Sequence, residues 1–210
     1  MTQGKSAPRF NTLTDRVRYH TSGLTTRLGL QLYNMGVHPD AITAAGLVIV
    51  AVASVVISQG HFAAGALILL LGTPLDALDG AVARAMQRKD RFGALFDSTL
   101  DRYADGFIFM ALAYHYSNQG NQNAMLLSIL ALLGSLLVSY VRARAEGLNL
   151  DCKVGLLTRM ERVFIILAML FTGLVIPGLW ILVVGTHVTV IQRVWYVYRA
   201  LRQQQGDNTR

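Results

Sequence analysis

From Asp40 onward, the chain divides into six stretches of membrane-spanning length. The stretches run roughly over residues 41–58, 62–86, 93–117, 124–147, 155–174 and 178–201. A bilayer core needs about 20 residues of helix, so six spans use most of the chain after Pro39. Charged residues make up only 15% of the sequence, well below the roughly 25% of a soluble domain. We therefore expect an all-α integral membrane bundle of six transmembrane helices.

The six stretches differ in polarity. The second, third and fifth contain charged residues and would score poorly on a hydropathy scan, although their flanks still indicate helix. Ahead of the first span, apolar residues recur at helical spacing, which favours a helix along the bilayer surface over a solvated tail: Leu24, Leu28, Leu32 and Met35. We divide the chain into a cytoplasmic N-terminal segment with this juxtamembrane helix (1–39), a six-helix domain (40–202) and a polar tail (203–210).

The distribution of basic residues predicts the topology. All 19 Lys and Arg residues lie near the termini or near the turns that join spans two to three and four to five. The three opposite loops contain none, which is the pattern of a cell-membrane protein with both termini and the basic turns in the cytoplasm. Because the basic residues mark one membrane interface, nucleic acid is disfavoured as a partner. A single cysteine, Cys152, excludes an internal disulfide framework.

Aspartates on spans two and three are the strongest chemical signal. Asp76 and Asp79 are three residues apart, Asp97 and Asp101 are four apart, and each pair projects from one helix face. Clustered acids at membrane depth demand a compensating cation. Carboxylate ligands suit Mg²⁺ or Mn²⁺, and two ions are possible, while no His or Cys cluster indicates zinc. The alternative is a structural network, in which the acids pair with Arg84 and Arg102.

The aspartate series resembles the motif of the CDP-alcohol phosphatidyltransferases, membrane enzymes of phospholipid synthesis. It runs Asp-x2-Asp-Gly-x2-Ala-Arg-x8-Gly-x3-Asp-x3-Asp from Asp76 to Asp101. The resemblance implies that four aspartates hold metal ions that bind the diphosphate of CDP-diacylglycerol: Asp76, Asp79, Asp97 and Asp101. It also makes Asp101 the general base that deprotonates the acceptor hydroxyl, with release of CMP.

The resemblance also assigns residues to the nucleotide. Gly80 and Arg84 would contact CDP, as would Asp40 and Thr43 at the start of the first span. For the latter two, capping of the helix is an equal alternative. The chain departs from the family at Asp90, where related enzymes often have Ser or Thr, so Asp90 either contacts the nucleotide or pairs with a basic neighbour.

Three arginines outside the motif point to the acceptor. Arg142, Arg162 and Arg193 resemble the basic residues that hold inositol phosphate in the phosphatidylinositol phosphate synthase branch, although that branch usually has Lys at the first position. Arginine binds phosphate through paired donors. Arg162 pairing with Glu161 or Glu146 is the alternative, and Arg144 is interpreted as a surface anchor.

Two other functions are alternatives to the predicted inositol phosphate-using enzyme. A phosphatidylglycerol phosphate synthase would use glycerol 3-phosphate, which also presents one phosphate and one attacking hydroxyl. A carboxylate-lined proton or cation transporter is a remote alternative, because its site belongs near the membrane midplane. The family resemblance further implies a homodimer embedded in membrane lipid.

Overall fold

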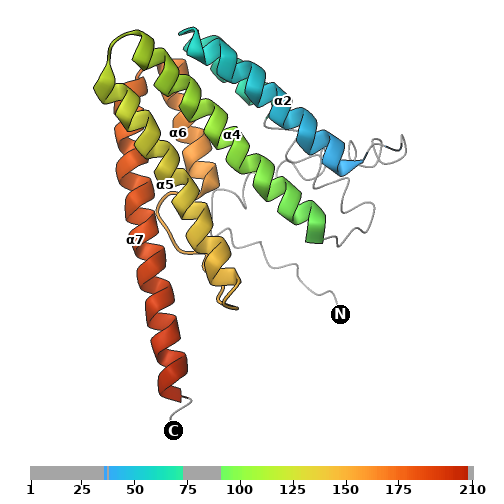
Figure 1. Ribbon diagram of the computed structural model, residues 1–210, viewed down its shortest axis with the longest axis vertical. Coiled ribbons are helices and arrows are strands. Elements are labelled where there is room, and N and C mark those ends of the chain that lie inside the picture. Colours follow the sequence, from blue (N-terminus) through green and yellow to red (C-terminus); the bar gives the residue numbers. More distant parts are fainter. Residues whose placement is uncertain (1–35, 37, 73–90, 208–210) are drawn as a thin grey trace, which may run out of the picture.

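The computed structural model describes residues 36, 38–72 and 91–207, and these form helices and turns. The labelled helices in Figure 1 are α2 (Pro39–Ser58), α4 (Arg91–Asn118), α5 (Gln122–Glu146), α6 (Arg159–Thr172) and α7 (Val175–Asp207). A further helix covers Phe62–Gly72, between α2 and α4. The all-α prediction is confirmed. The predicted surface helix before residue 36 and the segment 73–90 lie outside the described residues.

Three of the described helices are long and apolar enough to cross a membrane, namely Pro39–Ser58, Gln122–Glu146 and the Val175–Gln204 part of α7. They match the first, fourth and sixth of the predicted stretches. Helix α4 has 28 residues but carries the charged groups of the aspartate series. Helix α6 has only 14 residues, about 21 Å at roughly 1.5 Å per residue. The count of six spans is therefore not established by the described helices.

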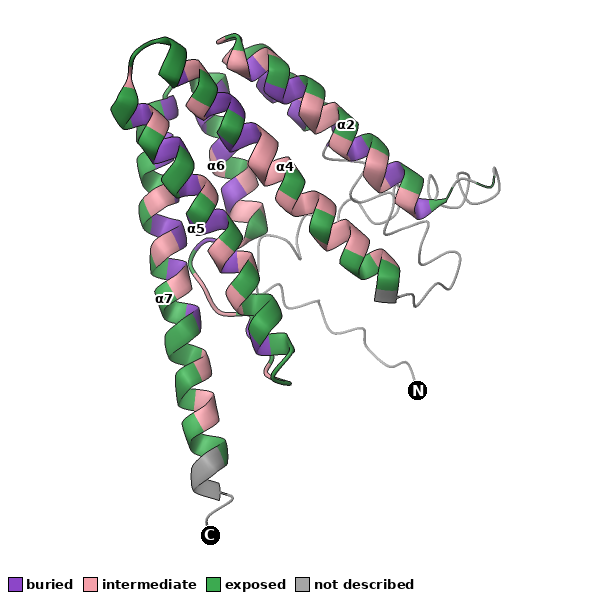
Figure 2. Cartoon of the chain, viewed as in Figure 1, coloured by how far each residue is buried: buried purple, intermediate pink, exposed green. Residues whose placement is uncertain are grey.

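The helices pack in a chain of neighbours. Helix α2 lies along α4, α4 along α5, α5 along α7, and α7 along α6. Large side chains at these contacts are fully buried, among them Phe109, Leu112, Leu170, Leu179 and Leu182. Figure 2 shows that α2 contributes buried residues to this core as well, whereas the C-terminal half of α7 is largely exposed.

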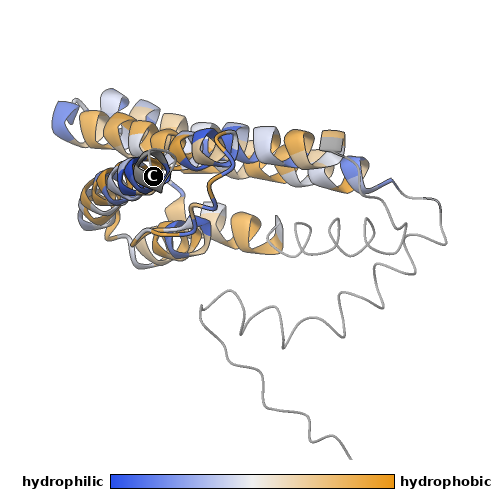
Figure 3. Ribbon diagram, turned by 90° about the horizontal axis from the view of Figure 1, so that it is seen from below, coloured by the Kyte–Doolittle hydropathy of each residue, from blue (hydrophilic) through white to orange (hydrophobic). Residues whose placement is uncertain are grey.

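The outward helix faces are apolar too. Val48, Val52 and Val55 of α2 are between 51% and 62% exposed. Leu126, Ile129, Leu130 and Leu133 repeat this on α5. Figure 3 shows hydrophobic residues along the described helices. An apolar surface of this extent would be unusual on a soluble monomer, but it is what lipid-facing helices require. The fold is thus of the membrane type.

The start of α6 differs from the prediction. The fifth stretch is expected over residues 155–174, but the helix begins at Arg159 because a capping box sets its first turn. Thr158 is the N-cap, and the Glu161 carboxylate accepts a hydrogen bond from the Thr158 backbone N–H at 2.9 Å. The preceding residues form a loop in which Gly155 has a φ of +137°, a conformation that other residues rarely adopt.

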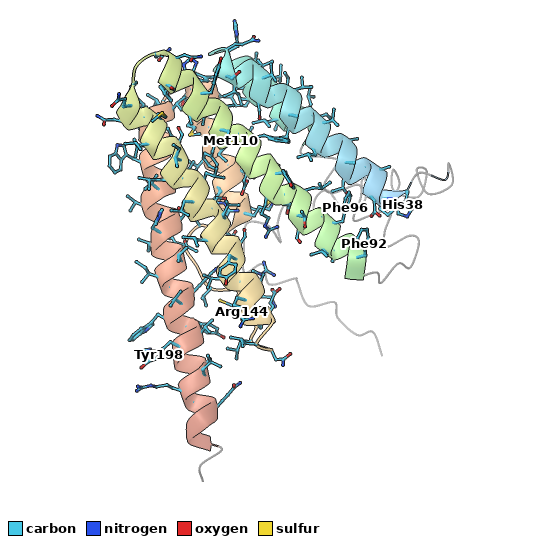
Figure 4. The ribbon with its side chains drawn as sticks, in the orientation of Figure 1. His38, Phe92, Phe96, Met110, Arg144 and Tyr198 are labelled. Carbon is cyan, nitrogen blue, oxygen red and sulfur yellow. The ribbon has the colours of Figure 1, made fainter. Side chains whose placement is uncertain are left out.

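One end of the bundle carries the basic residues of the described chain. The turns at the other end, which lie after α2, after α4 and after α6, contain no Lys or Arg. Helix α7 has 33 residues, about 50 Å in length, and extends past the bundle at the basic end (Figure 1). There the guanidinium groups of Arg199 and Arg202 stack 5.0 Å from the rings of Trp195 and Tyr198, and Tyr198 projects outward (Figure 4).

Candidate active site

One face of α4 carries a row of carboxylates. Asp97, Asp101 and Asp105 are spaced four residues apart, so their side chains project from the same side of the helix. All three residues are partly buried, and the side chains of Asp101 and Asp105 are only 16% and 18% exposed. We call this row the acid face of α4.

The other half of the predicted metal and nucleotide site lies outside the described residues. This applies to Asp76, Asp79, Gly80, Arg84 and Asp90. Within the described part of the chain, no group of three or more His, Cys, Asp or Glu side chains is placed to hold a metal ion. The metal site therefore stays a prediction that needs both halves of the aspartate series.

The first turn of α6 brings two arginines onto the acid face. Arg159 Nη2 lies 2.5 Å from Asp101 Oδ1, and Arg162 Nη2 lies 3.4 Å from Asp105 Oδ2. Helices α4 and α6 run in the same direction, so the two ion pairs follow one another along both helices. Arg102 adds a third guanidinium, 3.6 Å from Asp101 Oδ2. The Arg102 contact is one that the structural-network interpretation predicts, whereas neither interpretation predicts Arg159.

Asp105 is the partner that Arg162 requires. The arginine is only 4% exposed, and a buried charge of this kind needs an opposite charge or hydrogen-bond acceptors. Ser135 Oγ on α5 donates a hydrogen bond of 2.5 Å to Asp105 Oδ2, the oxygen that also faces Arg162. The contact thus links three helices: α4 through Asp105, α5 through Ser135 and α6 through Arg162.

The acidic partners considered for Arg162 from the sequence are engaged elsewhere. Glu161 caps the start of its own helix through Thr158. Glu146 accepts a hydrogen bond of 2.9 Å from Arg142 Nε. Arg162 therefore forms an ion pair, but with an aspartate two helices earlier in the chain rather than with either glutamate.

Arg193 is buried within α7 and fixes the loop that precedes α6. Its Nε donates to the Val154 carbonyl at 2.9 Å, and its Nη1 donates to the Val138 carbonyl of α5 at 2.6 Å. These two bonds use two of the five N–H donors of the guanidinium group. The side chain is only 3% exposed. An arginine at this depth in a span has found polar partners, as its position requires.

Two further α7 side chains hold the same loop. Thr189 Oγ1 accepts from the Leu157 N–H at 2.9 Å, and Gln192 Oε1 accepts from the Leu156 N–H at 3.1 Å. A Cβ on Gly155 would meet Thr189 and Arg193, so only glycine fits between the loop and α7. The loop ends at Thr158, the N-cap of α6, and thereby positions the first turn of α6 beside the acid face.

The three arginines predicted to bind the acceptor lie at one end of the bundle. Arg193 is close enough to Arg142 and Arg162 for their like charges to act on it. Arg142 is half exposed and pairs with Glu146. Arg144 is exposed at the end of α5, in keeping with a surface anchor (Figure 4).

The residues expected to contact CDP at the start of α2, Asp40 and Thr43, follow the N-cap residue of that helix. The N-cap is His38, which makes no side-chain cap bond. Asp40 Oδ2 lies 3.4 Å from His38 Nδ1, and Thr43 Oγ1 donates to the Pro39 carbonyl at 3.1 Å. His38 occupies the N-cap position, Asp40 lies in the first turn of the helix, and a nucleotide contact of Asp40 and Thr43 stays a prediction. On α7, the His187 side chain contacts the backbone of its own helix, with Nδ1 2.8 Å from the Val183 carbonyl.

Comparison with known proteins identifies the family. Residues 36–192 match the family model of CDP-alcohol phosphatidyltransferase. The chain belongs to the CDP-alcohol phosphatidyltransferase family. An archaetidylinositol phosphate synthase of Methanothermobacter thermautotrophicus is 39% identical over 169 residues, which cover 78% of this chain and 84% of that protein. A phosphatidylinositol phosphate synthase of Streptomyces avermitilis is 40% identical over 183 residues, covering 80% and 75%.

A solved structure of the family shares the fold. The phosphatidylinositol phosphate synthase PgsA1 of Mycobacterium tuberculosis with CDP-DAG bound superposes with a TM-score of 0.78. It is 29% identical, and the match covers 83% of this chain and 93% of that one. PgsA1 has also been solved in complex with manganese and citrate. The enzyme class predicted from the aspartate series, a CDP-alcohol phosphatidyltransferase, is thereby confirmed.

Three residues of the site escaped the sequence-based predictions. Asp105 continues the four-residue spacing of the acid face, and this spacing was the available signal. Arg159 stands three residues before Arg162, on the same helix face. No sequence pattern marks Ser135 as a site residue, because its contact with Asp105 arises only when α5 packs against α4 in this phosphatidyltransferase.

Proposed function

We propose that this phosphatidyltransferase moves the phosphatidyl group of CDP-diacylglycerol to a hydroxyl of inositol phosphate and releases CMP. The observation that carries the proposal is a pair of buried arginines: Arg162, which contacts the acid face of α4, and Arg193 of α7, which lies close enough to Arg162 for their charges to interact. The names of its relatives support the same acceptor. An acceptor without a phosphate would leave these arginines without a substrate group to bind.

The acceptor phosphate would bind to Arg162 and Arg193 from inside the bundle and to Arg142 from its exposed side. Among the described residues, Arg162 makes one side-chain contact, of 3.4 Å, with Asp105, and Arg193 uses two of its donors on carbonyl groups. Both therefore keep N–H groups for a phosphate, which guanidinium binds through two parallel hydrogen bonds. Glu146 would hold Arg142 in position from the outer side.

The diphosphate end of the donor would be held at the aspartates. We propose that Asp76, Asp79, Asp97 and Asp101 hold Mg²⁺ or Mn²⁺, with two ions at the site. The donor set fits, because Asp97 and Asp101 project from one face and Asp101 already attracts two guanidinium cations. The ions would supply Lewis acidity and neutralise the diphosphate charge. PgsA1 has been solved in complex with manganese.

Asp101 would take the proton of the acceptor hydroxyl. As that oxygen forms its bond to the lipid-linked phosphorus, the bond from this phosphorus to the CMP oxygen breaks. Asp101 lies one helical turn before Asp105, whose partner Arg162 would hold the acceptor phosphate. This spacing would bring the acceptor hydroxyl toward the base. Gly80, Arg84, Asp40, Thr43 and Asp90 would contact the nucleotide.

We propose that both termini and the active site face the cytoplasm, which the absence of Lys and Arg from the described turns at the opposite end supports. A homodimer is a further proposal, taken from the family resemblance. Light scattering of the detergent-solubilised protein would test it.

Release of CMP tests the proposed reaction. Purified protein, CDP-diacylglycerol and Mg²⁺ would be incubated with inositol phosphate, with glycerol 3-phosphate or with no acceptor. We expect CMP with inositol phosphate and much less with glycerol 3-phosphate. Use of glycerol 3-phosphate alone would assign the enzyme to phosphatidylglycerol phosphate synthesis, and no CMP with any acceptor would refute the proposal.

A further inference from the structure

The contact between Ser135, Asp105 and Arg162 differs from the other buried polar contacts of the described bundle. Asp105 Oδ2 accepts a hydrogen bond from Ser135 Oγ at 2.5 Å and faces Arg162 Nη2 at 3.4 Å. Ser135 is fully buried, and Arg162 is nearly so. One carboxylate oxygen thus receives two donors from two neighbouring helices.

Two other buried hydroxyl groups, one on α5 and one on α7, bond within their own helix. Ser128 Oγ donates to the Ala124 carbonyl at 2.9 Å, and Thr186 Oγ1 donates to the Leu182 carbonyl at 2.7 Å. Each of these bonds stays within one helix, four residues back, which is the usual solution for Ser and Thr in a helix. Ser135 instead reaches across to α4, so the orientation of its hydroxyl is determined by Asp105.

The charge balance explains why Arg162 needs this support. Arg162 lies close enough to three other arginines for their like charges to repel it: Arg102, Arg159 and Arg193. Like charges and burial both disfavour a fixed guanidinium group at this place. Asp105 offsets them from the α4 side, and Ser135 holds the carboxylate in one orientation.

We infer that Asp105 is a positioning residue for the acceptor site: held by Ser135, it orients the Arg162 guanidinium toward the phosphate of the acceptor. The inference rests on the proposed function, because it assigns Arg162 to the acceptor. Asp105 acts through Arg162 and does not touch the reacting atoms. The opposite role is physically distinct, since a carboxylate beside the phosphate would compete with it for Arg162 and weaken binding.

The test compares apparent KM values in three variants. Asp105→Asn keeps the size of the side chain and one acceptor oxygen but removes the charge. Ser135→Ala removes only the hydroxyl that holds the carboxylate. Ser128→Ala is the matched control, because Ser128 is a buried serine on the same helix, two turns away, that bonds its own backbone.

We expect Asp105→Asn to raise the KM for inositol phosphate about tenfold, since the bond it weakens is one to a charged group. Ser135→Ala should also raise the KM for inositol phosphate, but by a smaller factor. In the double variant, this KM should rise by less than the product of the two single effects, since both residues act through one contact. The KM for CDP-diacylglycerol should stay within about twofold in every variant, and Ser128→Ala should change neither KM.

Three results would overturn the inference. A lower KM for inositol phosphate in Asp105→Asn would make Asp105 a competitor of the phosphate. Equal increases for both substrates would make the contact merely structural. An unchanged KM for inositol phosphate in Ser135→Ala would show that Ser135 does not help to position Arg162. This variant is also the deciding test if Asp105→Asn does not fold. If the wild-type enzyme ignores inositol phosphate and uses glycerol 3-phosphate, the proposed acceptor fails, and the same KM comparison is made with glycerol 3-phosphate.

Discussion

Arg159 of α6 and Asp101 of α4 form an ion pair, with 2.5 Å between Nη2 and Oδ1. Asp101 is the residue that we propose as both a metal ligand and the general base. Its contact with Arg159 fixes the carboxylate at the boundary between the two predicted subsites. Along α4, Asp97 lies one turn before Asp101, and Asp105 with its partner Arg162 lies one turn after it.

Replacement of Asp101 by Asn tests its role as the base. The amide keeps the size and one metal-binding oxygen but cannot take the proton of the acceptor hydroxyl. We expect turnover to fall by roughly 10²- to 10⁴-fold, the usual effect of losing a general base. Binding of CDP-diacylglycerol, measured by equilibrium dialysis, should survive in part. Turnover within threefold of wild type would remove Asp101 from this role.

Removal of the metal tests the other function of the aspartates. EDTA should abolish CMP release, and added Mg²⁺ or Mn²⁺ should restore it. Asp97→Ala and Asp76→Ala should each be inactive, because each removes an anionic ligand from a site that binds both cation and diphosphate. Asp151→Ala is the control, since Asp151 is exposed and pairs with Lys153 on the loop before α6. Full activity in EDTA would contradict the metal-dependent mechanism.

Arg193→Gln should affect the acceptor more than the donor. Loss of a charged hydrogen bond is worth about 1.5 to 3 kcal/mol, so the KM for inositol phosphate should rise roughly 10- to 150-fold. The KM for CDP-diacylglycerol should change little. Arg144→Gln, on the exposed end of α5, should leave both KM values unchanged. If the binding of both substrates were weakened equally, the role of Arg193 would be structural, through its bonds with the Val138 and Val154 carbonyls.

Cys152 reports on the loop that Arg193 and Thr189 hold. The residue is fully buried, and burial raises the pKa of its thiol, so less thiolate is present at neutral pH and alkylation should be slow. The pKa shift means that the folded state favours the protonated thiol, and the resulting stability is lost as the pH rises through the raised pKa. Because Cys152 is the only cysteine, the site of labelling is unambiguous.

Thr189→Val should speed this labelling. The substitution keeps the shape but leaves the Leu157 N–H without its acceptor, and a loss of about 1 kcal/mol corresponds to roughly fivefold more loop opening. Thr186→Val is the control, because the bonds of Thr186 within the described part of the chain go to carbonyls of its own helix. Equal labelling rates in the two variants would show that Thr189 does not hold the loop.

The sequence predicted the features that depend on spacing along one helix. Apolar runs indicated the helices, and the four-residue spacing put Asp97 and Asp101 on one face of α4. The partner of Arg162 could not be predicted in this way, because Asp105 lies 57 residues earlier and meets it only through tertiary packing. For Arg193, the sequence showed that an arginine in a span needs polar partners, but not that these include two carbonyl groups.

The start of α6 could have been predicted better. Thr158 and Glu161 have the spacing of a capping box directly before an apolar run, and this pattern marks a helix N-terminus at Arg159. The conformation of the loop is different in kind. A φ of +137° at Gly155 depends on the close approach of Thr189 and Arg193, which lie more than 30 residues later. Nothing local in the sequence specifies that approach.

The proposed acceptor depends on recognition of its phosphate by Arg162, the buried arginine of α6. The most direct test measures kcat/KM for inositol phosphate and for inositol, in the wild type and in Arg162→Gln. The wild-type enzyme should prefer inositol phosphate by at least about 10²-fold, and Arg162→Gln should reduce kcat/KM for inositol phosphate roughly 10- to 150-fold while leaving that for inositol unchanged. Equal use of the two acceptors by the wild type, or an equal loss for both in Arg162→Gln, would contradict the claim.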